Sequence, residues 1–431
     1  MSALLQSLRE SIPAVRASSG AAEGDAARQA AVEAVLRDGL PGPRSEAWKY
    51  TPLRALERRA FAPSIDLPAY DEAVLAAIPA PRLVFVNGRF DAARSDASGL
   101  PAGVDLRAQA IAAPAQDEAP QDASGGDAIF ARLNDALAET GVRLRVGDGA
   151  VVETPLHLVF VGAAPADGPQ QDLAWHLRHD IEIGDNAALA LVEHHLHSGA
   201  HRHLANARVR LRIGTEAWVQ HVRIQAEAEG ATAVLRTDAT LAREAAYHRL
   251  DLELGTALSR HELHVRLEGA GARLHANGVL LAAGRRHLDT RLAIEHAARD
   301  TACSLLWRGI GAGRGHAVFH GGITILEGAD GSDASLSNKN LLLSESAEID
   351  TQPVLVIHAD EVKAAHGATV GQLDPTAMFY LRSRGLPADA ARRLLTAAFA
   401  REPLSAVIAP AELREAAQAQ LDAALQGLVG E

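Results

Sequence analysis

From about residue 142, apolar and polar side chains alternate with a period of two, in short runs separated by glycines. Leucines and charged residues alternate from Arg249 to Leu254, and the same alternation runs from Leu263 to Glu268 and from Val209 to Ile213. No proline occurs between residues 170 and 352, as expected where most backbone N–H groups pair in a sheet. The pattern predicts an all-β core of around a dozen strands.

This periodicity does not by itself separate a β-sandwich from a β-solenoid, in which the chain coils and stacks each strand on an earlier one. The runs recur irregularly, roughly every 12 to 18 residues, and no sequence motif repeats with them. An irregular spacing of this size fits a solenoid with imperfect coils. The sandwich remains open on pattern alone.

Helical patterns flank the core on both sides. Before it, residues 25–41 and 129–140 each place apolar side chains on one face. Residues 97–128 are rich in Ala, Pro, Asp and Gly, which predicts a mobile connection. After the core, Asp374 can cap a helix that begins at Pro375, and two further amphipathic stretches follow. This tail is either a cap over the β unit or a docking module for a partner, and the pattern does not decide between them.

Composition narrows the classes of partner. The chain has 431 residues and a formal net charge of −12, so it lacks the positive field that nucleic acid or anionic lipid requires. It has no run of 18 apolar residues, and Arg9 and Glu10 stand where a secretory signal would need an apolar stretch. We therefore expect a cytoplasmic protein that binds neither nucleic acid nor membrane.

The few lysines exclude a Walker-type nucleotide site. Lys49, Lys339 and Lys363 are the only ones, in a chain whose other basic residues are arginines, a bias typical of high-GC bacterial genomes. None of them follows a glycine, whereas a P-loop needs Gly-Lys-Ser/Thr to reach the phosphates. If ATP drives the work of this protein, another subunit is expected to hydrolyse it.

Two features could bind a metal or act as a nucleophile. The stretch EHHLHSGAHRH contains His194, His195, His197, His201 and His203. On a strand, His195 and His197 would share one face as metal ligands do, although an exposed hairpin that happens to use histidine is the alternative. The single cysteine, Cys303, lies among apolar residues and favours core filling over nucleophilic chemistry.

The stretch EVKAAHGATVG isolates His366 among alanine and glycine, so the imidazole is either structural filler or a deliberately separated ligand or proton carrier. This stretch, with FYLRSRGL after it, NKNLLLSESAEIDTQPVL before it and SEAWKYTPL near the start, resembles the SufD members of the SufB/SufD family. These are scaffold proteins for iron–sulfur cluster assembly. The likeness runs from about residue 44 to 403, with the motifs in the family's order.

The resemblance implies a right-handed parallel β-helix between two helical domains, with boundaries at 1–141, 142–373 and 374–431. It also implies a cytoplasmic SufB–SufC–SufD complex, in which this non-catalytic chain pairs with SufB through the β-helix and docks the ATPase SufC. A homodimer is left open for the chain in isolation. The docking residues expected in the C-terminal helices are Phe379, Tyr380, Leu381, Arg382, Leu394, Leu395 and Phe399.

One departure from the family pattern concerns the site itself. Many members have a cysteine where this chain has Ala364, so no thiolate is expected beside His366. His366 remains as a neutral nitrogen ligand at the SufB interface, because imidazole is an acceptable iron ligand. We expect no cofactor bound stably by this chain alone, a nascent cluster shared with SufB, and reduced flavin as an option for the complex. The rival functions are a β-helix carbohydrate-active enzyme and a metalloprotein built on the 194–203 histidines.

Overall fold

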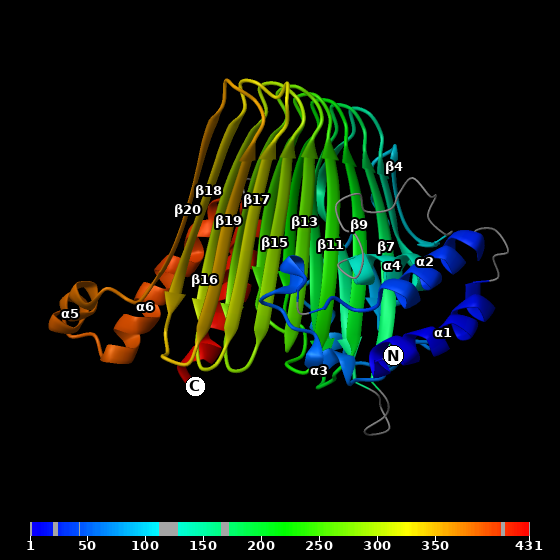
Figure 1. Cartoon of the computed structure of the whole chain (residues 1–431), viewed down its shortest axis with the longest axis horizontal. Helices are drawn as coiled ribbons and strands as arrows, with labels where there is room; N and C mark the ends of the chain where they lie inside the picture. The colour runs from blue at the N-terminus through cyan, green and yellow to red at the C-terminus, as the bar shows by residue number, and fades with distance from the viewer. Residues whose placement is uncertain are drawn as a thin grey trace.

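Two long sheets, each of ten strands among the described residues, form the body of the protein in a computed structural model. One sheet, called the odd-numbered sheet here although it includes β4 and lacks β3, has the order β19-β17-β15-β13-β11-β9-β7-β5-β4, with β1 beside β7. The other sheet runs β20-β18-β16-β14-β12-β10-β8-β6-β2-β3. Because neighbours in each sheet are two strands apart in sequence, the chain crosses to the opposite sheet and returns one coil later (Figure 1). The expected parallel β-helix with helices at both ends is confirmed.

The structure describes residues 2–19, 25–42, 44–111, 128–164, 172–406 and 410–430. The odd-numbered strands are β1 Ala62–Pro63, β3 Arg89–Phe90, β5 Thr140–Val146, β7 Leu173–Ile183, β9 Leu204–Ile213, β11 Thr232–Leu241, β13 Leu258–Leu267, β15 His287–His296, β17 His316–Ile325 and β19 Glu348–Ile357. The even-numbered strands are β2 Arg82–Val86, β4 Val104–Ala110, β6 Val151–Ala163, β8 Ala188–Ser198, β10 Trp218–Gln225, β12 Ala246–Glu253, β14 Arg273–Ala282, β16 Ala302–Gly311, β18 Asp333–Leu342 and β20 Lys363–Gly371.

Parallel strands in each sheet pair residue for residue, so apolar side chains of successive coils stack on one another between the sheets. Strands β11 and β13 pair in parallel without a slip, so Ala239 lies beside Val265 and Leu241 beside Leu267. All four are buried in the cluster that fills the space between the sheets. Each fully buried leucine contributes roughly 1.5–3 kcal/mol, and the rows repeat from coil to coil. A register slip of one residue would turn a whole row outward, which is why the alternation fixes the pairing.

All but one of the N-terminal helices cover the outer face of the odd-numbered sheet. They are α1 Ala3–Ser19, α2 Asp25–Asp38, η1 Glu46–Trp48, α3 Arg54–Glu57 and α4 Ile129–Leu137, and their apolar side chains share one core with Leu204 and Val234 of the sheet. The exception is η2 Glu72–Leu75, whose Leu75 packs with Val84 and Val159 of the even-numbered sheet. Among the described residues, no helix of the molecule has the length and apolar character needed to cross a bilayer.

The structure also includes strands before residue 142, the expected start of the core, in the two sheets of the β-helix. Strand β2 pairs with β6 in parallel, and β4 pairs antiparallel with β5. Strand β4 also lies inside the stretch expected to be a mobile connection, of which residues 112–127 fall outside the described residues. Strand β2 does not show the period of two because it is a continuous buried run, with both of its faces covered.

The C-terminal segment contains α5 Pro375–Ser383, α6 Ala388–Arg401, η5 Glu402–Ala406, α7 Ala411–Gln426 and η6 Gly427–Gly430. Helix α7 packs Leu413 and Leu421 against the outer face of the even-numbered sheet, where Val222 and Leu250 lie. This part of the tail is therefore a cap. Helix α5 differs, because it has no buried residue and projects at the end of the molecule beside the last coils (Figure 1).

Candidate functional site

The last coil leaves both sheets open at one end. Strand β19 ends the odd-numbered sheet and β20 ends the even-numbered sheet, and neither has a partner on its outer side among the described residues. Neither strand contains a buried residue, in contrast to the strands before them. Val356, Ile357 and Val370 are 39–44% exposed here. Folded proteins usually protect such edges, so two open apolar edges side by side indicate a surface built for pairing.

His366 lies on this open coil. Its register partner in β18 is Leu336, which is buried between the sheets, so the His366 side chain stands on the inner face of β20. With no further coil above it the residue is exposed. It has no hydrogen bond or ion pair with any described residue, and a Cβ added at the adjacent Gly367 would meet nothing within 4 Å. The alanines and glycine around it leave the imidazole accessible to a second chain.

Cys303 is not placed for nucleophilic chemistry. Its side chain is buried between the sheets, and its Sγ lies 3.3 Å from Nε2 of His296. Burial raises the pKa of the thiol to about 12, so the thiolate is scarce at neutral pH. The position agrees with the expectation of core filling.

The 194–203 histidines are not an exposed hairpin, because three of the five side chains are buried and only His197 is exposed. His195 stacks on Phe160 with ring centroids 5.0 Å apart. His203 accepts a hydrogen bond from the Leu173 backbone N–H and places its other nitrogen 3.1 Å from the Ala163 carbonyl. These nitrogens already have protein partners. Within the described residues, the one set of three ligating side chains close enough for a metal is instead His316, Glu348 and Asp350.

The residues expected to dock a partner divide into two groups. Phe379 and Tyr380 of α5 are 74% and 56% exposed, and Leu394 of α6 is also exposed. Phe399 is half-buried, packs against the α7 core, and lies under the Arg308 guanidinium, 5.5 Å from its ring centroid. Of the remaining three, Arg382 is exposed, while Leu381 and Leu395 are half-buried. The exposed members suit an interface, whereas Phe399 holds α6 against the sheet.

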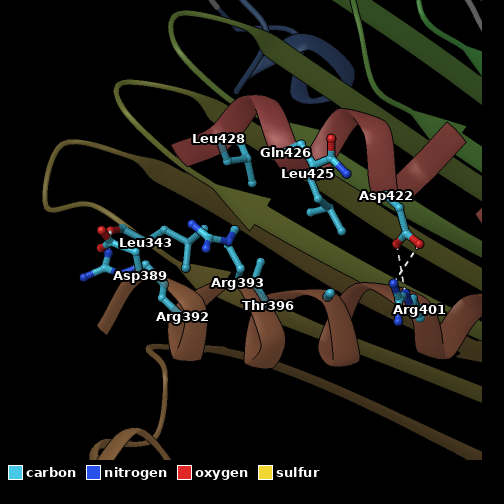
Figure 2. Close-up of a pocket in the computed structure, with 11 residues that line it drawn as sticks. Leu343, Asp389, Arg392, Arg393, Thr396, Arg401, Asp422, Leu425, Gln426 and Leu428 are labelled. Carbon is cyan, nitrogen blue, oxygen red and sulfur yellow. Dashed lines mark hydrogen bonds and ion pairs between the residues drawn. The ribbon is translucent and has the colours of Figure 1, made fainter. Parts of the chain in front are cut away.

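A cavity of about 350 Å³ opens between α6 and α7 (Figure 2). Leu425 and Leu428 of the α7 region and Leu343 after β18 supply apolar lining. Arg401 on one side forms a two-point ion pair with Asp422, at 2.7 and 2.9 Å, which joins α6 to α7. The size is at the lower end of small-molecule pockets. It gives the C-terminal helices a recognition feature besides the exposed apolar side chains.

A family model described as "SUF system FeS cluster assembly, SufBD core domain" matches residues 166–399, which include most of the β-helix, the open coil, α5 and most of α6. The chain belongs to the SufBD family. The iron–sulfur cluster assembly protein SufD of Escherichia coli is 32% identical over 377 residues, covering 86% of each chain. A SufBD family protein of Synechocystis is 29% identical over 88% of this chain, and SufD of Bacillus subtilis is 27% identical over 62%.

Membership in the SufBD family bears directly on the expected functions. It supports iron–sulfur cluster assembly and gives no support to a carbohydrate-active enzyme. Nor do the 194–203 histidines provide the metal site that the third alternative required. Ala364 packs against the core at the open coil, so this SufBD chain contributes no thiolate beside His366.

The sequence patterns singled out His366 but not the surface in which it lies. Val356 and Ile357 end a run of four apolar residues, and Val370 lies among small residues, so nothing in these sequences marks the three side chains as exposed. Their exposure follows only from their place in the last coil. One signal was present in the sequence, since the helix cap at Asp374 marks the end of the β-helix just after residue 371.

Proposed function

We propose that this chain is a non-catalytic scaffold subunit of a cytoplasmic SufB–SufC–SufD-type complex, which pairs with SufB through the open coil formed by β19 and β20. The observation that carries the proposal is the pair of unprotected strand edges, with His366 on the inner face of one of them. A second β-helix would continue both hydrogen-bond ladders and bury the exposed valines and isoleucine.

In this proposal His366 supplies a neutral imidazole to iron, or to a nascent cluster that it shares with a thiolate of SufB. The cluster is cargo, held at the junction of the two chains until transfer. Small neighbours allow the two backbones to approach closely without a competing ligand. The sulfur donors come from the partner, because Cys303 is buried and residue 364 is alanine.

Pairing is tested by charging the open edge. The double variant Val356→Lys, Val370→Lys keeps the fold, since both side chains are already exposed, but places two ammonium groups where the partner strands would lie. We expect loss of the heterodimer with SufB in size-exclusion chromatography and an unchanged thermal melt. Val151→Lys, at an exposed position that starts β6, is the matched control and should pair normally. Normal pairing of the double variant would refute this surface.

The role of His366 is tested separately from pairing. His366→Ala should form the complex as the wild type does and reconstitute clusters more slowly, measured by anaerobic absorbance. His358→Ala, an exposed histidine just after β19, is the control and should reconstitute at the normal rate. Cluster formation by His366→Ala at the wild-type rate would contradict a ligand role for His366. Loss of the complex in this variant would show that the residue is structural.

The absence of a Gly-Lys phosphate loop supports assigning ATP hydrolysis to the partner SufC. The purified chain should therefore hydrolyse no ATP, and addition of SufC should supply the activity. An ATPase activity of this chain that a substitution within it abolishes would refute the scaffold assignment.

A further inference from the structure

A row of side chains that could bind a metal crosses the outer face of the odd-numbered sheet. His366, in contrast, lies on the inner face of the even-numbered sheet. Parallel pairing places His287 of β15, His316 of β17 and Glu348 of β19 in register. Asp350 follows two residues after Glu348 and so lies on the same face of β19. Three strands that are about 30 residues apart in sequence thereby bring these side chains to one face of the sheet.

Three of these side chains converge. The ligand atoms of His316, Glu348 and Asp350 all lie within 4.8 Å of one another, and Nε2 of His316 is 2.7 Å from Oδ2 of Asp350. His316 and Asp350 are half-buried and Glu348 is exposed, so the group is held by the sheet and open to solvent. A metal bound at about 2.0–2.2 Å from each donor needs only small rotations of the carboxylates.

The His316 ring is held from its other side. The His287 ring meets it edge to face, with centroids 4.5 Å apart and an interplanar angle of 73°. Nε2 of His287 in turn lies 3.1 Å from the hydroxyl of Thr51, a buried residue of the N-terminal segment. Such contacts behind a ligand orient its ring before a metal binds.

Charge also fits a cation at this place. Glu348 and Asp350 bring two carboxylates. Lys49 senses the charge of Asp350, because its pKa is raised mainly by its hydrogen bond to Tyr50 and to a smaller extent by the charges of Glu46 and Asp350. Lys49 is exposed on a flexible side chain and its ion pair is with Glu46, so its ammonium group does not occupy the site but adds positive charge near it. Removing that ammonium group should strengthen metal binding.

We propose that His316, Glu348 and Asp350 bind one divalent first-row metal ion of the Fe²⁺ class. One imidazole and two carboxylates are the donor set of such ions, whereas Cu⁺ and iron–sulfur clusters favour thiolates. Three protein ligands leave coordination positions for water or for a group of a bound partner. The site is distinct from His366 and does not depend on its role.

The test is an anaerobic titration of the full-length protein with Co²⁺, whose visible absorption reports coordination, followed by Fe²⁺ in competition. We expect one site, with affinity lowered at least roughly tenfold in His316→Ala and Asp350→Asn. Lys49→Met should bind Co²⁺ more tightly than the wild type. Thermal melts accompany each variant, and Glu348→Gln provides a milder change at an exposed position.

His358→Ala is the control and should bind Co²⁺ with wild-type affinity. The proposal is overturned if the His316 and Asp350 variants keep wild-type affinity, or if His366→Ala abolishes the binding instead. It also fails if wild-type protein shows no site, since His316 and Asp350 then form only an ion pair. His316→Ala should leave pairing with SufB unaffected, so the scaffold proposal stands even if this metal site is refuted. Failure of the open-coil variants to affect pairing would likewise leave the metal site untouched.

Discussion

Arg249 donates two hydrogen bonds to the carboxylate of Asp251, at 2.8 and 2.9 Å, with both side chains sealed between the sheets. Asp251 also accepts a hydrogen bond of 2.8 Å from Arg223 of the neighbouring strand. Burial acts to raise the pKa of Asp251, but the positive charge of Arg249 outweighs it and holds the pKa well below its usual range. The interior of this β-helix therefore contains a charged network where an apolar row was to be expected.

Removing one charge from this network should be costly. Asp251→Asn leaves the guanidinium group of Arg249 buried without its carboxylate, and leaves Arg223 with Glu253 alone. We expect a loss of about 3–5 kcal/mol in the free energy of unfolding, measured in urea. Glu216→Gln breaks an exposed pair with Arg243 and should change the free energy of unfolding far less, because solvent screens this pair. If the two variants lost similar amounts of unfolding free energy, the buried pair would contribute no more to stability than the exposed pair.

Glu227 should make stability fall as pH rises. Burial raises the pKa of its carboxyl group to about 8, the negative charge of Glu253 adds to the shift, and its Oε2 has no partner among the described residues. Between an unfolded pKa near 4.3 and the folded value, the native state holds a proton that the unfolded state has lost. Stability is then greatest below this window and is lost as pH rises through about 8.

The measurement is urea unfolding at pH 6, 7, 8 and 9. Glu227→Gln carries no ionisable group, so its stability relative to the wild type should increase with pH and level off above pH 8. Parallel pH profiles for the two proteins would mean that Glu227 is ionised in the native state.

The exposed aromatics of α5 are expected to anchor SufC. Phe379→Ala with Tyr380→Ala should weaken SufC binding by about 2 kcal/mol or more, measured by calorimetry, because exposed aromatic side chains dominate interfaces of this kind. Ile65→Ala with Leu67→Ala removes equally exposed apolar side chains near the N-terminus and serves as the control. Unchanged affinity in the α5 variant would place the dock elsewhere.

Cys303 should resist thiol reagents in the native protein. Its thiol is 4% exposed with a pKa of about 12, so reaction with a disulfide reagent at pH 8 should be slow until urea is added. Ala364→Cys places a second thiol on the open coil and should react at least roughly tenfold faster. Rapid native labelling of Cys303 would show that the coils around it open readily.

The sequence by itself determined the elements. Strict alternation, as from Arg249 to Leu254, imposes extended backbone because only a strand places successive side chains on opposite faces. The Asp374 side chain accepts a hydrogen bond from the Thr376 N–H at 2.9 Å. The helix start predicted from Asp374 and Pro375 therefore depends only on residues that are adjacent in sequence. The motifs around His366 likewise indicated the family before the fold was seen.

The tertiary structure decided which face is inside and which residues meet. Leu250 faces outward under α7, while Arg249 points between the sheets. Because both faces of this strand are covered, alternation with a period of two does not show which face is the inner one. The meeting of His316 with Asp350 depends on register between coils about 30 residues apart, which no local pattern encodes. The openness of the coil that carries His366 has the same origin, because an edge strand differs from an inner strand only in having no neighbour.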